Sequence, residues 1–448
     1  MRIDAQFLAV KSGLADLRAK IVRTPIDPIQ TFLDDPLRVL RSVRFASRLN
    51  FSLDTELRKT IRRDDIQSAL VRKVRKSVYD IELNRLIAFI SYLSNIHLTL
   101  ILLPQVSRER VGSEVDLMLR SSRPVCAGKM LYELNLMSCV FPLKDIPGVE
   151  GKDFNCYYRN GVQLLATTHS YLCSNVKHPP GWCKLANDAD ILLTNDEETR
   201  RLLWYACLFH PYMVAYSEHV ASQADEVVPV VSSKKKQRKG KKSTQSPLFT
   251  LLLDELKRPS KDAQNVETIQ ECAIKFSDLV MNEGGWEGVN VLVSGVKVLP
   301  NDKNIVKDED IENDVLLQNA MEFRLKCFRI LKRCKNLWRA SLVLSLCHEL
   351  RRCSDDPGEE IIFERKVDVL SQYNAFALSL LRLNLIGIWN MKLLIDGDKI
   401  KANVLPNLPR GPLFRDVMDK QGDYMVRHPG CTVEMVENHL RNEFSQYV

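Results

Sequence analysis

The sequence predicts a mainly α-helical protein built from several subdomains. Along long stretches, apolar residues recur three and four positions apart, which is the spacing of one face of a helix. Strand-like alternation is sparse, and the chain has no regular internal repeat. Its 448 residues are 45% hydrophobic and 27% charged, an ordinary composition for two to four compact units, each with its own core.

Five runs carry the helical spacing most clearly, at 36–49, 109–119, 197–208, 315–346 and 359–383. Turn-forming residues and charge replace the periodicity at 142–151, 222–247 and 300–314. We therefore expect these three stretches to separate the helices. Together the runs and breaks indicate an elongated helical protein.

The segment 83–104, LNRLIAFISYLSNIHLTLILLP, is the most apolar part of the chain. A membrane-spanning helix needs about 20 predominantly apolar residues. Asn84, Arg85, Asn95 and His97 interrupt this one. We therefore expect a buried helix, or the inserted segment described below, and no contact with a membrane.

The net charge is +8, but the segment KKKQRKGKK at 234–242 holds seven of the positive charges. The rest of the chain is close to neutral, so a surface for nucleic acid has to come from local arrangement. A lysine run is most often a solvated linker and less often a nuclear import signal. It is also a weak candidate for RNA contact, with the side chains of Lys234, Lys235, Lys236, Arg238, Lys239, Lys241 and Lys242.

Twelve cysteines occur singly, without a CxxC pair. This favours reduced thiols in an intracellular protein and argues against zinc. His348-Glu349 begins like the HExxH helix of zinc enzymes, but Arg352 stands where the second histidine is needed. We expect an ordinary helix there, and we assign neither metal ligands nor catalytic residues.

The segment 31–49, TFLDDPLRVLRSVRFASRL, has a local structural explanation for its acidic start. Asp35 before Pro36 fits a helix N-cap followed by proline at the first helical position, where a carboxylate suits the helix dipole. Arginines recur on one helix face, at 41, 44 and 48, and small apolar residues on the opposite face, at 39, 43 and 46. Such a face is most often a solvated surface.

The same residues also have a functional interpretation. An aspartate only accepts hydrogen bonds and an arginine only donates them, so Asp35 and Arg38 offer an acceptor beside a fork of donors. Cytosine and adenine present the matching edge, an amine beside an unprotonated ring nitrogen, whereas uracil and guanine would leave polar groups unpaired. Arg41 and Arg44, further along the helix, would then hold the triphosphate.

These residues and their neighbours resemble two sequence motifs of a known family. The segment 13–51, GLADLRAKIVRTPIDPIQTFLDDPLRVLRSVRFASRLNF, resembles the end of the flexible-loop motif and the nucleotide-selecting motif of class II CCA-adding tRNA nucleotidyltransferases. The family pattern E-D-x-x-R-x-x-R-x-x-R-F is matched at 34–45, with Asp34 in place of the usual glutamate. The resemblance implies that Asp35 and Arg38 pair with the incoming C or A, and that Arg41 and Arg44 surround the nucleotide.

The resemblance continues along nearly the whole chain. VSRERVGSEVDLML at 106–119 is similar to the family's following helical motif, which supports the neck, and the sequences at 393–421 and 428–440 resemble the tail of eukaryotic members. It implies addition of C, C and A to the tRNA 3′ end from CTP and ATP, with Mg²⁺. The implied partner is tRNA, gripped at its acceptor and T arms through phosphates and A-form shape. No obligate protein partner is evident.

Two motifs of the family's head are absent from the sequence. The family holds two Mg²⁺ with carboxylates from a GGxVRD motif and a following DxD. The DxD spacings at 188–190 and 308–310 do not follow a glycine turn. We therefore expect at most a remnant of the α/β nucleotidyltransferase head, with Met1 an internal methionine or a misplaced start, and a chain that selects nucleotides and binds RNA but does not catalyse alone. Two alternatives are a non-catalytic tRNA-binding or RNA-binding protein and a non-functional truncated splice product.

The segment 74–105 interrupts a helix that is continuous in the family. Joining Lys73 to Val106 restores the pattern IQSALVRKVSRERVGSEVDLML. The ends of the segment can be written as splice-donor and splice-acceptor codons, so we hypothesise that these residues are a translated intron. A genuine helical insertion is the alternative. Intronic sequence has had no selection for packing, so we expect its neighbours to accommodate it poorly.

The sequence thus predicts four segments. They are a remnant of the head with the flexible-loop motif at 1–33, the nucleotide-selecting neck at 34–145 with the insertion at 74–105, the body at 146–330 with a basic loop at 232–245, and a tRNA-binding body and tail at 331–448. We expect an intracellular protein of the cytoplasm or nucleus. Full-length members of the family can also be mitochondrial or plastid proteins.

Overall fold

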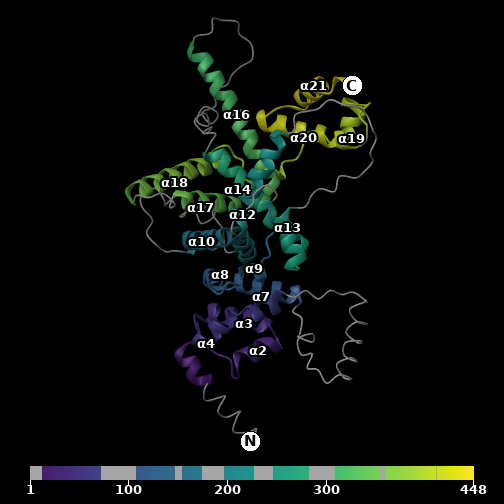
Figure 1. Ribbon diagram of the computed structural model, residues 1–448. Coiled ribbons are helices and arrows are strands. Elements are labelled where there is room, and N and C mark those ends of the chain that lie inside the picture. Colours follow the sequence, from purple (N-terminus) through teal and green to yellow (C-terminus); the bar gives the residue numbers. More distant parts are fainter. Residues whose placement is uncertain are drawn as a thin grey trace, which may run out of the picture. The chain divides into compact units, whose positions relative to one another are not determined.

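The structure, a computed structural model, describes residues 13–71, 107–146, 154–173, 196–226, 246–281, 308–353, 359–409 and 411–448 (Figure 1). The chain divides into two compact units. Unit 1 comprises Met1–Asn175 and Asn195–Gln270, and unit 2 comprises Val176–Thr194 and Glu271–Val448. The described residues are mainly helical, which confirms the predicted fold class. None of the helices in these ranges combines the length and the apolar composition that spanning a membrane requires.

Unit 1 holds a small two-stranded sheet and a series of helices. Its described elements are β1 (Ile21–Val22), α2 (Pro28–Asp34), α3 (Leu37–Leu49), β2 (Ser52–Leu53), α4 (Thr55–Ile61), α5 (Asp64–Val71), α7 (Arg108–Leu119), α8 (Pro124–Glu133), α9 (Met137–Val140), α10 (Phe154–Cys173), α12 (Glu197–Glu226), α13 (Pro247–Thr250) and the π-helical turn η1 (Leu251–Glu255). Helix α14 (Ser260–Met281) begins in unit 1 and ends in unit 2.

Side-chain caps fix where several of these helices begin. The carboxylate of Asp27 accepts a hydrogen bond from the amide of Gln30 and starts α2, with Pro28 at its first position. Asp54 caps α4 and Ser107 caps α7 in the same way. The strands β1 and β2 pair in parallel, with Ile21 opposite Ser52 and Val22 opposite Leu53. This pairing ties the two ends of the segment that contains α2 and α3.

The apolar face of α3 lies in the core of unit 1. Val39, Val43 and Ala46 are fully or almost fully buried, as their spacing predicted, and α3 packs on α7 and α8. Two glycines allow close approach of backbones. A Cβ at Gly112 would overlap the carbonyl oxygen of Leu256, and a Cβ at Gly161 of α10 would overlap that of Leu208 in α12. Any larger residue at these two positions would push the packed elements apart.

The described secondary-structure elements of unit 2 are all helices or helical turns. They are the end of α14, α16 (Asp308–Cys334), η2 (Lys335–Leu337), α17 (Trp338–Arg352), α18 (Glu359–Arg382), η4 (Ile388–Asn390), α19 (Gly397–Lys399), η5 (Ile400–Val404), α20 (Pro412–Arg427), α21 (Val433–Glu443) and η6 (Ser445–Tyr447). The run with helical spacing predicted at 315–346 is helical but contains parts of two helices. Lys335 has a φ of 48°, and a three-residue 3₁₀ turn separates α16 from α17 there.

The C-terminal helices of unit 2 share a small core. It is built from Ile395, Ile400, Val404, Leu405, Leu408, Val417, Val436, Leu440 and Phe444. The buried amide of Gln421 in α20 donates to the carbonyl of Ile395 at 3.0 Å and accepts from its amide at 2.8 Å. Along α16, Arg329 pairs with Asp423 and Lys332 with Asp419, which ties α20 to that helix. The predicted insertion at 74–105 and the basic loop at 232–245 lie outside the described residues.

Candidate nucleotide-binding site

The two adjacent carboxylates predicted to face the nucleotide lie at the junction of α2 and α3. Asp34 is the last residue of α2 and is exposed, and Asp35 follows with an extended backbone. The Oδ1 atom of Asp35 accepts a hydrogen bond from the amide of Leu37 at 3.2 Å. The carboxylate therefore does help to start α3, although the helix begins one residue later than the N-cap interpretation predicted.

Arg38 lies in the first turn of α3 with an exposed side chain. Its Nη1 donates to the carbonyl oxygen of Thr31 at 3.2 Å, and its backbone amide donates to that of Asp35 at 3.0 Å. No bond joins the Asp35 and Arg38 side chains within the described part of the chain. The two groups are thus near neighbours at the start of one helix without neutralising each other.

Arg41 and Arg44 converge on a carboxylate from another helix. Glu114 of α7 accepts from the Nε of Arg44 at 2.7 Å and from the Nε of Arg41 at 3.3 Å. The Glu114 side chain is 9% exposed, whereas those of Arg44 and Arg41 are 14% and 41% exposed. Arg44 also stacks over the ring of Phe45, with 4.2 Å between the guanidinium carbon and the ring centroid. Arg41 and Arg44 are therefore paired with a nearly buried carboxylate and are not freely solvated.

Helix α7 supplies two residues that the sequence interpretation missed, Glu114 and Arg110. The Nη2 of Arg110 lies 3.3 Å from Oδ2 of Asp35, and the Nη1 of Arg41 lies 3.5 Å from the same oxygen. Arg110 and Glu114 were overlooked because the motif that contains them was taken only as support for the neck. A signal was present, since Glu114 stands among the apolar residues Val111 and Val115, where a carboxylate needs a cationic partner.

The start of α7 is fixed by Arg108, which is almost fully buried. Its guanidinium donates to the carbonyl oxygens of Glu255 at 2.8 Å, Cys139 at 3.1 Å and Val140 at 2.8 Å. These oxygens lie at the ends of η1 and α9, where helical carbonyls lack partners. Burial lowers the pKa of Arg108, against the opposing effect of the Glu255 carboxylate. Arg108 thereby anchors the helix that presents Arg110 and Glu114.

The end of α7 is held by a buried ion-pair network. Asp116 accepts from Arg201 of α12 at 2.8 Å, and Arg201 donates to Asp262 of α14 at 2.8 Å. Burial alone would lower the pKa of Arg201, but the hydrogen bond to Asp262 and the charge of Asp116 raise it. Tyr205 is fully buried beside Asp116. Burial raises the pKa of its hydroxyl, and the charge of Asp116 adds to the effect. Both ends of α7 are therefore tied to elements other than α3.

The described residues do not form a metal site. No group of three or more His, Cys, Asp or Glu side chains in those ranges is placed to hold a metal ion. The Mg²⁺ that the family resemblance implies thus has no set of ligands among the described residues. The lysines and arginine of the predicted RNA-binding loop lie outside the described residues.

Sequence comparison finds relatives along most of the chain. The tRNA nucleotidyltransferase cca2 of Schizosaccharomyces pombe is 23% identical over 424 residues, which are 95% of this chain and 63% of the relative. The mitochondrial CCA tRNA nucleotidyltransferase of Saccharomyces cerevisiae is 36% identical over 131 residues, 29% of this chain and 18% of the relative. The chain thus spans less than two thirds of the length of these relatives. No family model matches it.

Among solved structures, the CCA-adding enzyme of Bacillus stearothermophilus in complex with CTP is 14% identical, covering 96% of this chain and 67% of that one. Its TM-score of 0.40 is too low to compare the folds. The sequence relatives are named as tRNA nucleotidyltransferases, and one of them is similar to this chain over 95% of its length. This similarity confirms the resemblance to CCA-adding tRNA nucleotidyltransferases that the pattern at 34–45 predicted.

Proposed function

We propose that this chain selects CTP and ATP for addition of C, C and A to the 3′ end of tRNA. The observation that carries the proposal is the start of α3, where Asp35 and the exposed Arg38 are neighbours without an ion pair between them. An acceptor and a fork of donors at this spacing match the amine and the ring nitrogen of cytosine or adenine.

Asp35 keeps the capacity to accept a further hydrogen bond. Its Oδ1 takes one from the Leu37 amide, and its Oδ2 faces Arg41 and Arg110 at 3.5 and 3.3 Å. A carboxylate has about four acceptor positions, so one remains for the amine of the base. The two guanidinium groups fix the orientation of the carboxylate, which limits the conformational entropy lost when a nucleotide binds.

Uracil and guanine would be rejected by the same groups. Each presents a carbonyl oxygen to Asp35 and a ring N–H to Arg38, so an acceptor would meet an acceptor and a donor would meet a donor. A site built to hydrogen-bond a substrate rejects a mismatched one because its own polar groups are left unpaired, at about 1–3 kcal/mol for each group.

Arg41 and Arg44 are suited to the triphosphate. Both use Nε for Glu114, which leaves the terminal amino groups of Arg44 without a described partner. With Arg110, the cluster has three guanidinium groups against the carboxylates of Asp35 and Glu114, so one net positive charge remains for phosphate oxygens, which guanidinium groups bind well. Glu114 would thereby orient the two arginines without cancelling their combined charge.

We further propose that these 448 residues bind nucleotide and tRNA but do not transfer the nucleotide alone. The sequence contains neither the GGxVRD motif nor a DxD after a glycine turn, the carboxylates on which the family's chemistry depends. Incubating the chain with CTP, ATP, Mg²⁺ and tRNA that lacks CCA should give no extension. Supplying a catalytic head should give extension. Extension by the chain alone would contradict this part of the proposal.

The selection itself is testable without catalysis. Equilibrium binding of the four ribonucleoside triphosphates should give CTP and ATP affinities at least about tenfold above those of UTP and GTP, since each stranded polar group costs about 1–3 kcal/mol. Equal affinities for all four would contradict selection by the pair at the start of α3.

A further inference from the structure

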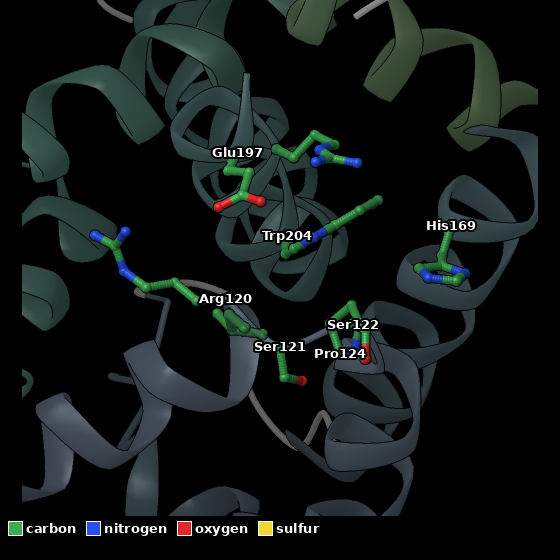
Figure 2. Close-up of a pocket in the computed structure, with 9 residues that line it drawn as sticks. Arg120, Ser121, Ser122, Pro124, His169, Glu197 and Trp204 are labelled. Atoms are coloured by element: carbon green, nitrogen blue, oxygen red, sulfur yellow. The ribbon is translucent and has the colours of Figure 1, made fainter. Parts of the chain in front are cut away.

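A basic hollow lies in unit 1 apart from Asp35 and Arg38. The end of α7, the start of α8, α10 and the start of α12 enclose a cavity of about 300 Å³, lined among others by Ser122, His169, Arg200 and Trp204 (Figure 2). A second hollow of about 490 Å³ adjoins it and is lined by Arg123 and Lys129, again with Ser122 and His169. The two hollows share Ser122 and His169 in their linings, and we refer to the adjoining pair as the groove.

Three cationic side chains of this groove lack an ion-pair partner among the described residues, although the charge of Asp196 acts on one of them, Arg200. Arg120 is committed to Asp116 and Glu198. Arg123, Lys129 and Arg200, by contrast, make no ion pair within the described part of the chain. Glu197 is the one acidic residue of the lining. Uncompensated like charges in a concave site repel one another and raise the local concentration of anions.

The uncharged polar side chains of the groove can also bind an anion. The His169 ring lies 5.7 Å from that of Trp204, and burial, with the nearby charge of Arg200, lowers the pKa of His169. The imidazole is therefore neutral at pH 7, so it can donate one hydrogen bond and accept another. The hydroxyl of Ser122 has no bond within the described residues and is also free to donate to an oxygen.

We infer that this groove binds the phosphate backbone of RNA. Guanidinium forks and a lysine favour phosphate oxygens, and a serine hydroxyl and a histidine N–H complete a set of donors for them. The cationic residues extend through two adjoining hollows, which favours a run of successive phosphates over one isolated anion. The inference rests on the proposed function, because it takes tRNA as the RNA that binds.

The test is the salt dependence of tRNA binding, measured by filter binding. Arg123 and Lys129 are exposed, so Arg123→Ala/Lys129→Ala leaves the core intact. Each phosphate contact contributes about 0.7–0.9 to the slope of log affinity against log salt. The double variant should make this slope less steep by about 1.5, and Arg200→Ala should make it less steep by about 0.8. The matched control, Arg48→Ala/Lys59→Ala, removes the same charge from exposed sites without ion pairs in the described ranges and should leave the slope unchanged.

Unchanged tRNA affinity and slope in both groove variants would overturn the inference while leaving the proposed selection of CTP and ATP intact. Loss of CTP binding with normal tRNA binding would overturn it as well, because the groove would then serve a free nucleotide. If the unmodified chain does not bind tRNA at all, the inference fails together with the tRNA part of the proposed function. Nucleotide selection would still be tested separately through Asp35 and Arg38.

Discussion

Replacing Glu114 by glutamine tests whether this buried carboxylate organises the arginine face of α3. The change keeps the shape of the side chain and one acceptor oxygen, but it removes the charge and turns the other oxygen into an amide donor. Glu114 accepts from Arg44 at 2.7 Å and from Arg41 at 3.3 Å. After the change, one of the two arginines must face another donor.

The magnitude follows from these contacts. Arg44 stays charged, so its bond to the remaining oxygen falls from the upper to the lower part of the range of about 1.5–3 kcal/mol for hydrogen bonds to a charged group, a loss of about 1 kcal/mol. The donor left facing the new amide costs about 1–3 kcal/mol if it stays buried. Arg41 is 41% exposed and can turn to water, so the lower end of that range applies. We expect a total loss of about 2 kcal/mol.

Urea unfolding measures this loss. With a denaturant dependence of about 2 kcal/mol per molar urea, the midpoint should fall by about 1 M. CTP affinity should fall in the same variant, because Arg41 and Arg44 lose their common anchor. Glu109→Gln is the control, since Glu109 is an exposed glutamate in the first turn of the same helix. Equal midpoints and equal CTP affinities for the two variants would refute the role given to Glu114.

Three further changes test the packing and pH dependence of unit 1. Arg108→Met should lower the free energy of unfolding by about 3–5 kcal/mol, because three buried carbonyl oxygens lose their donor; a loss below about 1 kcal/mol in urea unfolding would contradict its anchoring role. Gly161→Ala should cost about 1–3 kcal/mol, because its Cβ overlaps the backbone of α12. An unchanged melting temperature would show that the two helices have room to part. The hydrogen bond from Arg23, with a smaller effect of backbone amides, lowers the pKa of Asp54. Its stabilisation is therefore present above about pH 4 and lost as the pH falls through the lower folded-state pKa. Asp54→Asn should accordingly flatten the fall in melting temperature below pH 4. A variant whose melting temperature falls as steeply as that of the unmodified chain would contradict the stabilising role of the Arg23–Asp54 hydrogen bond.

Local patterns predicted the helices well and the tertiary contacts poorly. The spacing of Val39, Val43 and Ala46 identified the buried face of α3, because that spacing is set within one helix. The run at 315–346 hid a break, because the positive φ of Lys335 leaves no trace in the spacing of apolar residues. The four predicted segments at 1–33, 34–145, 146–330 and 331–448 stay a prediction.

In the candidate site, too, the local features could be predicted from the sequence and the tertiary contacts could not. The order of Asp35, Arg38, Arg41 and Arg44 along one helix could be read from the sequence, together with the chemistry that such a row permits. The partner of Arg41 and Arg44 could not, because Glu114 is separated from them by 73 and 70 residues and meets them only when α7 packs on α3. The contact of Arg110 with Asp35 is equally non-local.

We propose that Asp35 and Arg38 together choose cytosine and adenine. The most direct test of this choice compares the binding of CTP, ATP, UTP and GTP to the unmodified chain, to Asp35→Ala/Arg38→Ala, and to Arg48→Ala as an exposed arginine on the same helix. The unmodified chain and Arg48→Ala should prefer CTP and ATP, and the double variant should bind all four with similar, weaker affinity. A double variant that still prefers CTP and ATP as strongly as the unmodified chain would contradict the account.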